Sequence, residues 1–235
     1  MSNFQPQPAW ISASTAETGM RVRAFIRSVY AWMFGGLLLT AFASVWVVSS
    51  PAMQQLVRNP MVLIGLIIAE FGLVFAISFG LKRFSAATAA SMFLVYALLN
   101  GLTLSFIFWA YTTSSIVQAF VVAGGMFGAM SVYGLATKRD LTSWGSFFFM
   151  GLIGIVLCAV VNLFLHSTGL SFIISIIGVF VFVGLTAWDT QKLKSYATVG
   201  GPMQENLAVF GALALYLDFV NLFLFLLRLL GDRRR

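Results

Sequence analysis

Apolar residues occur in long stretches along this chain, and short polar connections separate them. Seven stretches reach about 20 residues, the length that an α-helix needs to cross about 30 Å of hydrocarbon. We predict transmembrane helices at 29–48, 61–81, 86–110, 115–136, 145–166, 170–189 and 207–230. The pattern therefore predicts an all-α membrane protein, with a seven-helix membrane domain at 21–235. Residues 1–20, rich in Ser, Thr, Gln and Pro, are predicted to be a mobile N-terminal tail.

The composition supports a bilayer as the solvent of this chain. Hydrophobic residues make up 60% of it and charged residues 9%, against about 25% charged residues in soluble domains. The net charge is +7, but most basic residues lie between apolar stretches, where they orient membrane proteins, so we expect no nucleic-acid partner. With one cysteine, Cys158, and one histidine, His166, the chain cannot form an intrachain disulfide or a multi-histidine metal site.

Basic residues alternate between the connections. They precede the first apolar stretch and follow the second, fourth and sixth: Arg21, Arg23, Arg27, Lys82, Arg83, Lys138, Arg139, Lys192 and Lys194. The positive-inside rule therefore predicts a cytoplasmic N-terminus. Three arginines at 233–235 do not follow this rule if the last stretch makes a seventh crossing, because they then lie outside. A re-entrant last segment would instead return them to the inside. We favour seven crossings, because the last stretch is continuous and contains no proline.

Three acids fall within the predicted membrane helices, namely Glu70, Asp189 and Asp218. An ionised aspartate at the centre of a bilayer costs at least about 2.5 kcal/mol, so such acids usually have a function. Helical side chains tilt toward the N-terminus of their helix, so on antiparallel helices Asp189 and Asp218 lean toward each other. Two adjacent carboxylates share a proton and titrate as a unit. Their oxygens suit hard cations such as calcium, so the pair is predicted to be a proton-controlled latch and a transient calcium ligand.

Two alternatives stay open for these acids. The same tilt brings Glu70 of the second stretch toward Arg228 of the seventh, so these residues could form a charge pair. Arg228 could equally extend to the lipid headgroups, as long basic side chains do near helix ends. For Asp189, the alternative is an ordinary acid at a helix end beside Lys192.

The spacing Gly124–Gly128 is a GxxxG match, which we interpret as generic helix packing.

Two long motifs resemble those of a known family. One motif resembles the C-terminal signature of the Bax inhibitor-1 family, also called the transmembrane Bax inhibitor motif family. It is the run Leu215-Tyr-Leu-Asp-Phe-Val-Asn-Leu-Phe-Leu-Phe-Leu-Leu-Arg228. A second motif resembles the other signature of this family, with tryptophan where tyrosine is common. It is the run Phe180-Val-Phe-Val-Gly-Leu-Thr-Ala-Trp-Asp-Thr-Gln-Lys-Leu-Lys194. The segment Lys138-Arg-Asp-Leu141 is similar to sequences of the bacterial branch of this family.

The resemblance implies seven helices, with the last one surrounded by the other six. It also implies a pH-sensitive calcium leak governed by Asp189 and Asp218, in the inner membrane of a bacterium. In that pattern a basic residue after the second helix, here Lys82 or Arg83, pairs with the first aspartate. The Glu70–Arg228 pair also agrees with the family pattern. Some bacterial relatives associate with a membrane-bound ATP-dependent protease, which implies a possible partner.

Three functions compete. The first is a cation leak with calcium as the transported ion and no cofactor. The second is an interaction protein that modulates a membrane-bound ATP-dependent protease, with the buried acids as structural locks. The third, an intramembrane aspartyl protease, is disfavoured because Leu215-Tyr-Leu-Asp218 replaces the usual Gly-x-Gly-Asp and Pro-Ala-Leu is absent. We therefore expect no enzymatic activity.

Overall fold

Helices form all the regular structure in the part of the chain that the computed structural model describes, residues 9–80, 83–199 and 202–234. They are α1 (Ala9–Ser49), α2 (Pro51–Arg58), α3 (Pro60–Gly80), α4 (Ala86–Leu104), α5 (Ile107–Ala110), α6 (Thr113–Ala136), α7 (Thr142–Leu165), α8 (Thr168–Tyr196) and α9 (Pro202–Leu230). Seven spans within these ranges are long and apolar enough to cross a membrane. The predicted all-α, seven-span architecture is confirmed.

Two features near the N-terminus differ from the sequence prediction. Helix α1 begins at Ala9, so residues 9–20 of the predicted tail are helical, and the first eight residues lie outside the described part. The amphipathic helix α2 was also missed, because its eight residues are too few and too polar to resemble a span. It begins in a standard way, since the Ser50 side chain accepts from the Met53 N–H and Pro51 follows it.

Short polar residues mark where the long helices begin. In each case a hydroxyl accepts a hydrogen bond from the backbone N–H three residues later: Ser85 from Thr88, Thr112 from Ser115 and Ser167 from Leu170. These caps satisfy donors that the first helical turn leaves unpaired. Helix α7 ends at Leu165, and the next residue, His166, has a φ of 49°, in the left-handed region. The tight connection makes α7 and α8 antiparallel neighbours.

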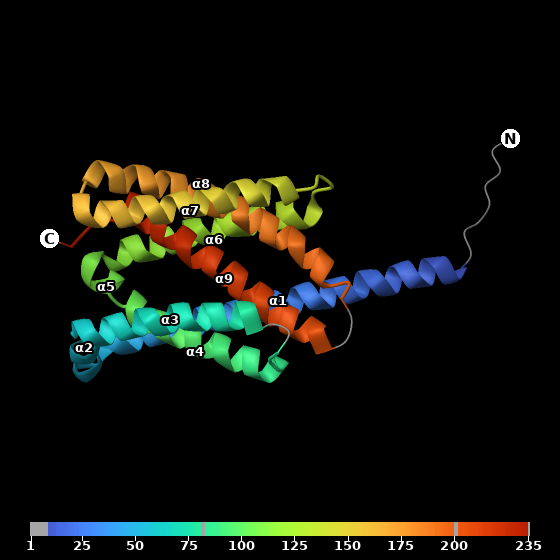
Figure 1. Ribbon diagram of the computed structural model, residues 1–235, viewed down its shortest axis with the longest axis horizontal. Coiled ribbons are helices and arrows are strands. Elements are labelled where there is room, and N and C mark those ends of the chain that lie inside the picture. Colours follow the sequence, from blue (N-terminus) through green and yellow to red (C-terminus); the bar gives the residue numbers. More distant parts are fainter. Residues whose placement is uncertain (1–8, 81–82, 200–201, 235) are drawn as a thin grey trace.

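Helix α9 runs between two groups of helices, with α1, α3 and α4 on one side and α6, α7 and α8 on the other (Figure 1). It packs chiefly against α1, α4, α6 and α8, while α3 packs on α4 and α7 on α8. In its most apolar stretch, 67% of α9 is buried, against 6% in α3 and in α7. The expected ring of six helices around the last one is not confirmed, because four helices make most of its contacts.

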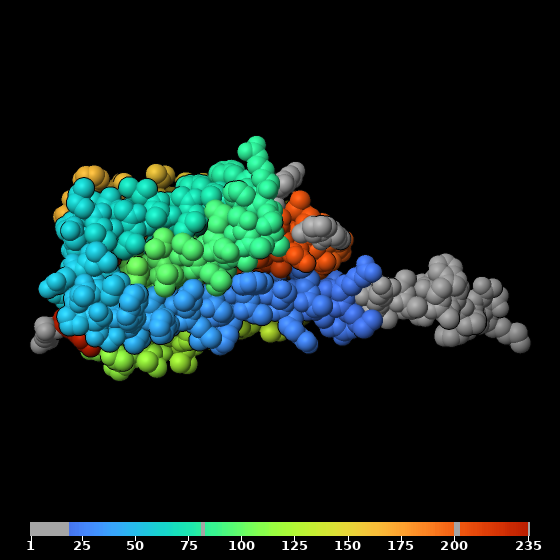
Figure 2. All heavy atoms as spheres, turned by 90° about the horizontal axis from the view of Figure 1, so that it is seen from below, coloured from blue at the N-terminus to red at the C-terminus, as the bar shows by residue number. Residues whose placement is uncertain are grey.

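The surface of the bundle is largely apolar. Phe79 of α3 and Phe164 of α7 are 82% and 81% exposed, and many aliphatic residues accompany them. In Figure 2 the atoms of α1 form a band along the molecule beside those of α4, with which α1 packs. Exposed aromatic and aliphatic surface on this scale requires lipid as the solvent.

The beginning of α1 and the end of α9 lie at opposite ends of the bundle (Figure 1). Helix α9 is continuous, so the structure favours seven crossings over a re-entrant last segment. The residues after α9 are fixed to the connection between α5 and α6. The Thr112 N–H donates to the Asp232 carbonyl at 3.2 Å, and the Arg234 N–H donates to the Ala110 carbonyl at 3.0 Å.

Candidate functional site

The structure brings Asp189 of α8 and Asp218 of α9 together. Their carboxyl groups lie within hydrogen-bonding reach of each other. Asp218 is buried, with 4% of its surface exposed, and Asp189 is partly exposed. Both acids lie on spans that are long enough to cross the membrane. The site is therefore a carboxyl pair inside the bundle, with one member more accessible than the other.

Close packing of three helices positions this pair. Helix α8 packs against both α6 and α9. At Gly134 of α6, an added Cβ would meet the carbonyl oxygen of Ala187, two residues before Asp189. On the other side of α8, an added Cβ at Gly178 would lie 2.6 Å from the ring of Phe225 on α9. Glycine at these positions lets α8 approach its neighbours closely, as small residues do in membrane bundles.

Buried polar atoms without partners occur on the same three helices. Within the described part of the chain, no hydrogen-bond donor reaches Oδ2 of Asp218. The hydroxyls of Ser131 on α6 and Thr190 on α8 are also buried without a partner. Buried polar groups are normally satisfied, so unpaired oxygens indicate a place for a proton, a water molecule or a cation. Sequence reasoning did not identify Ser131 and Thr190, because isolated hydroxyls in apolar helices carry no distinctive pattern.

The basic neighbour of Asp189 is on its own helix. Lys192 interacts electrostatically with Asp189, and its Nζ lies 4.6 Å from the ring centroid of Trp188. Arg83 is exposed, and no described contact joins it to Asp189; Lys82 lies outside the described residues. Asp189 therefore has the two neighbours considered from the sequence, Asp218 and Lys192, and the structure does not bring Arg83 to it.

Glu70 faces α4 and not α9. Its carboxylate accepts hydrogen bonds from Thr103 Oγ1 at 2.9 Å and from Asn100 Nδ2 at 3.3 Å. The Tyr216 hydroxyl donates to Asn100 Oδ1 at 3.0 Å and lies 2.6 Å from Thr40 Oγ1. These five side chains form a polar network that joins α3, α4, α9 and α1.

Of the two alternatives that the sequence left open for Arg228, the Glu70–Arg228 charge pair is not formed between these two described residues. Glu70 has its partners on α4, whereas Arg228 is exposed near the end of α9 and lies 5.7 Å from the ring centroid of Phe225. The tilt argument considered depth in the membrane but not the direction around the helix axis. The alternative, an arginine that extends toward the end of its helix, agrees better with the structure.

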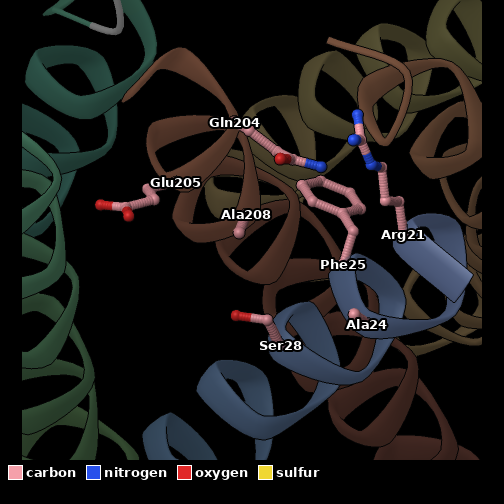
Figure 3. A pocket seen from close by; sticks show the side chains of 7 residues that line it. All are labelled: Arg21, Ala24, Phe25, Ser28, Gln204, Glu205 and Ala208. Atoms are coloured by element: carbon pink, nitrogen blue, oxygen red, sulfur yellow. The ribbon is translucent and has the colours of Figure 1, made fainter. Parts of the chain in front are cut away.

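A cavity of about 250 Å³ lies between α1 and the first turns of α9 (Figure 3). Its lining includes Phe25 on α1 and Ala208 on α9, and neither aspartate belongs to it. Ala208 precedes Asp218 by about 15 Å along α9, at about 1.5 Å per residue. The cavity therefore belongs to the end of the bundle where α9 begins and is separate from the carboxyl pair.

The described residues contain no group of three or more His, Cys, Asp or Glu side chains that could hold a metal ion. Two carboxylates alone supply fewer oxygens than a calcium site requires, which is about 6–8. The chemistry that this arrangement supports is the binding of a proton or the transient contact of a cation.

Comparisons with known proteins agree with the motifs. A family profile described as "Inhibitor of apoptosis-promoting Bax1" matches residues 22–235. The inner membrane protein YbhL of Escherichia coli strain K12 is 48% identical over 95% of this chain and 97% of its own length. An uncharacterized protein of Rickettsia prowazekii is 44% identical over 91% of each chain. An uncharacterized membrane protein of Streptococcus pyogenes serotype M3 is 40% identical over 92% of this chain and 95% of its own length.

Proposed function

The chain belongs to the Bax inhibitor-1 family, and we propose that it is a pH-sensitive cation leak of the bacterial inner membrane with calcium as the transported ion. The observation that supports this most directly is the carboxyl pair of Asp189 and Asp218 on two packed spans. Proton-binding acids inside a membrane bundle usually serve ion or proton movement. We further propose that the N-terminus is cytoplasmic, in agreement with the positive-inside rule.

The pair acts as a latch between α8 and α9. When it holds a proton, the hydrogen bond between Asp189 and Asp218 keeps the two helices together. When the proton leaves, two negative charges in a water-poor site repel each other. The helices then separate or a cation offsets the charge, and the flux rises as the pH rises.

Calcium fits the chemistry of this route because it binds flexible sets of oxygen ligands. The pair offers carboxylate oxygens, and the unpartnered hydroxyls of Ser131 on α6 and Thr190 on α8 add neutral oxygens. Water molecules complete the ligand shell during passage. Calcium is therefore the cargo and not a resident cofactor, and no enzymatic step is proposed.

The experiment is calcium flux into liposomes that contain the purified protein, measured across pH with a calcium dye. Asp218→Asn replaces the proton with an amide donor, so the latch stays closed and the pH dependence disappears. Asp140→Asn is the matched control, because among the described residues this exposed loop acid accepts hydrogen bonds from Thr142 alone. Calcium flux that does not change with pH in the unmodified protein would contradict the proposal.

The second candidate is a membrane interaction protein that modulates a membrane-bound ATP-dependent protease. The Glu70–Asn100–Tyr216–Thr40 network favours it, because there a half-buried acid ties helices together through hydrogen bonds. Co-purification of such a protease together with no flux in pure vesicles would support this candidate over the leak.

A further inference from the structure

A cavity of about 370 Å³ lies where α7, α8 and the end of α9 meet. Its polar lining consists of Asn162, His166, Thr168, Ser171, Arg228 and Arg233. We propose that this cavity binds the phosphate of an anionic phospholipid headgroup. The proposal is independent of the leak, because the cavity lies near the ends of the spans and includes neither Asp189 nor Asp218.

The charge of the cavity favours an anion. Two arginines are among its lining residues, and these include no acid. Arginine stays protonated in proteins and presents several N–H donors in a planar fork that matches phosphate oxygens. Glu70, which the sequence analysis considered as an ion-pair partner of Arg228, accepts hydrogen bonds from Thr103 and Asn100 instead. Among the described residues no ion pair joins either arginine to a carboxylate, so an external anion can balance both charges.

The frame of the cavity is ordered by hydrogen bonds before any ligand binds. Asn162 donates to Ser171 Oγ at 2.7 Å and accepts from the Ser167 N–H at 3.1 Å. Because Ser171 Oγ accepts this bond, its own hydrogen is available to a ligand. The backbone next to Arg233 is also fixed, since the Asp232 N–H donates to Ser115 Oγ at 3.0 Å. A preorganised set of donors binds an anion without a large loss of entropy.

The position of the cavity identifies the source of the phosphate. One of its walls is Leu163, which is 69% exposed and lies beside Phe164 on the apolar surface of α7. The connection between α7 and α8, with His166 and Thr168, forms another wall at the end of the spans. A phospholipid places its phosphate at this depth and its acyl chains along the exposed side chains of α7. Free phosphate shares the chemistry of the headgroup but gains nothing from the apolar wall.

A lipid phosphate also accounts for basic residues at this end of α9. Under the predicted orientation, Arg228 and Arg233 lie on the outer side, where the positive-inside rule disfavours basic residues. A bound phosphate neutralises them there. The same contact would fasten the end of α9 to α7 and α8 through a lipid.

The test is lipid binding to the full chain, measured by native mass spectrometry after release from detergent micelles. Phosphatidylglycerol is compared with zwitterionic phosphatidylcholine and with inorganic phosphate. We expect roughly tenfold tighter binding of phosphatidylglycerol than of phosphatidylcholine, because both lipids offer a phosphate but the positively charged choline of the second is repelled by the two arginines. Equal binding of the two lipids overturns the proposal. Displacement of phosphatidylglycerol by millimolar phosphate shows a soluble anion site and overturns the assignment to lipid.

Variants localise the effect. The double variant Arg228→Gln with Arg233→Gln is expected to lose the tenfold preference, and the lysine pair at the same positions is expected to keep part of it. The matched control is Arg58→Gln with Arg234→Gln, which removes the same charge from positions outside the cavity lining. Equal loss in the control contradicts a specific site. Asp218→Asn keeps the lipid preference, so failure of the leak and failure of the lipid site are distinguishable.

Discussion

The Tyr216 hydroxyl of α9 donates a 3.0 Å hydrogen bond to Oδ1 of Asn100 on α4. Asn100 in turn donates to Glu70 of α3, so the central part of α9 is tied to two helices of the neighbouring group. On the opposite flank of the bundle, α9 meets α8 through Asp218 and Asp189. One helix therefore carries both the central tyrosine of a polar network and one member of the carboxyl pair.

Tyr216→Phe should destabilise the bundle by about 1 kcal/mol, because it leaves Asn100 and Thr40 without a shared buried partner. The measurement is unfolding in mixed micelles, followed by circular dichroism. Tyr133→Phe is the control, since Tyr133 is exposed at the surface of α6. If both variants unfold alike, the buried network does not stabilise the bundle.

A double-mutant cycle distinguishes the observed network from the predicted ion pair. We expect Glu70→Gln and Arg228→Gln to have additive effects on stability, within about 0.5 kcal/mol, because the residues share no contact. Glu70→Gln and Thr103→Val should couple, since Thr103 Oγ1 donates to the Glu70 carboxylate at 2.9 Å. A coupling between Glu70 and Arg228 larger than that between Glu70 and Thr103 contradicts the hydrogen-bonded arrangement of Glu70.

The hydrophobic pattern predicted the spans well, because burial in lipid requires about 20 apolar residues whatever the packing. The side-chain tilt also indicated that Asp189 and Asp218 approach each other, and their carboxyl groups lie within hydrogen-bonding reach. Rotation about each helix axis could not be predicted, because these helices are apolar on all sides. For that reason the sequence suggested Arg228 as the partner of Glu70, where the structure has Asn100 and Thr103.

Asp140 provides a prediction about acid pH outside the spans. Hydrogen bonds from the Thr142 hydroxyl and backbone lower the pKa of the Asp140 carboxyl. A carboxyl whose pKa is lowered on folding stabilises the fold above its unfolded pKa, and this stability is lost as the pH falls through the lowered value. Asp140→Asn should therefore change stability slightly at neutral pH and not at strongly acid pH. The measurement is the unfolding midpoint of the variant and of the unmodified protein at these two pH values. An equal difference between the two proteins at both pH values contradicts a stabilising role of the ionised Asp140 carboxylate.

The two glycine positions Gly134 and Gly128 of α6 give opposite predictions for the same substitution. An added Cβ at Gly134 would meet the Ala187 carbonyl, and this backbone atom can move only if α6 and α8 separate. Gly134→Ala should therefore lower the unfolding free energy by about 1–3 kcal/mol, the usual effect of overpacking.

Gly128 belongs to the GxxxG match with Gly124, yet nothing lies within 4 Å of an added Cβ at either position. Gly128→Ala should be neutral or stabilise by up to about 1 kcal/mol, because alanine favours the helix. Separation of α6 from α8 also displaces the backbone next to Asp189, so Gly134→Ala should alter the pH response of calcium flux while Gly128→Ala leaves it intact. Unfolding and flux measured on both variants test this, and equal behaviour would show that the close approach of α6 does not position the pair.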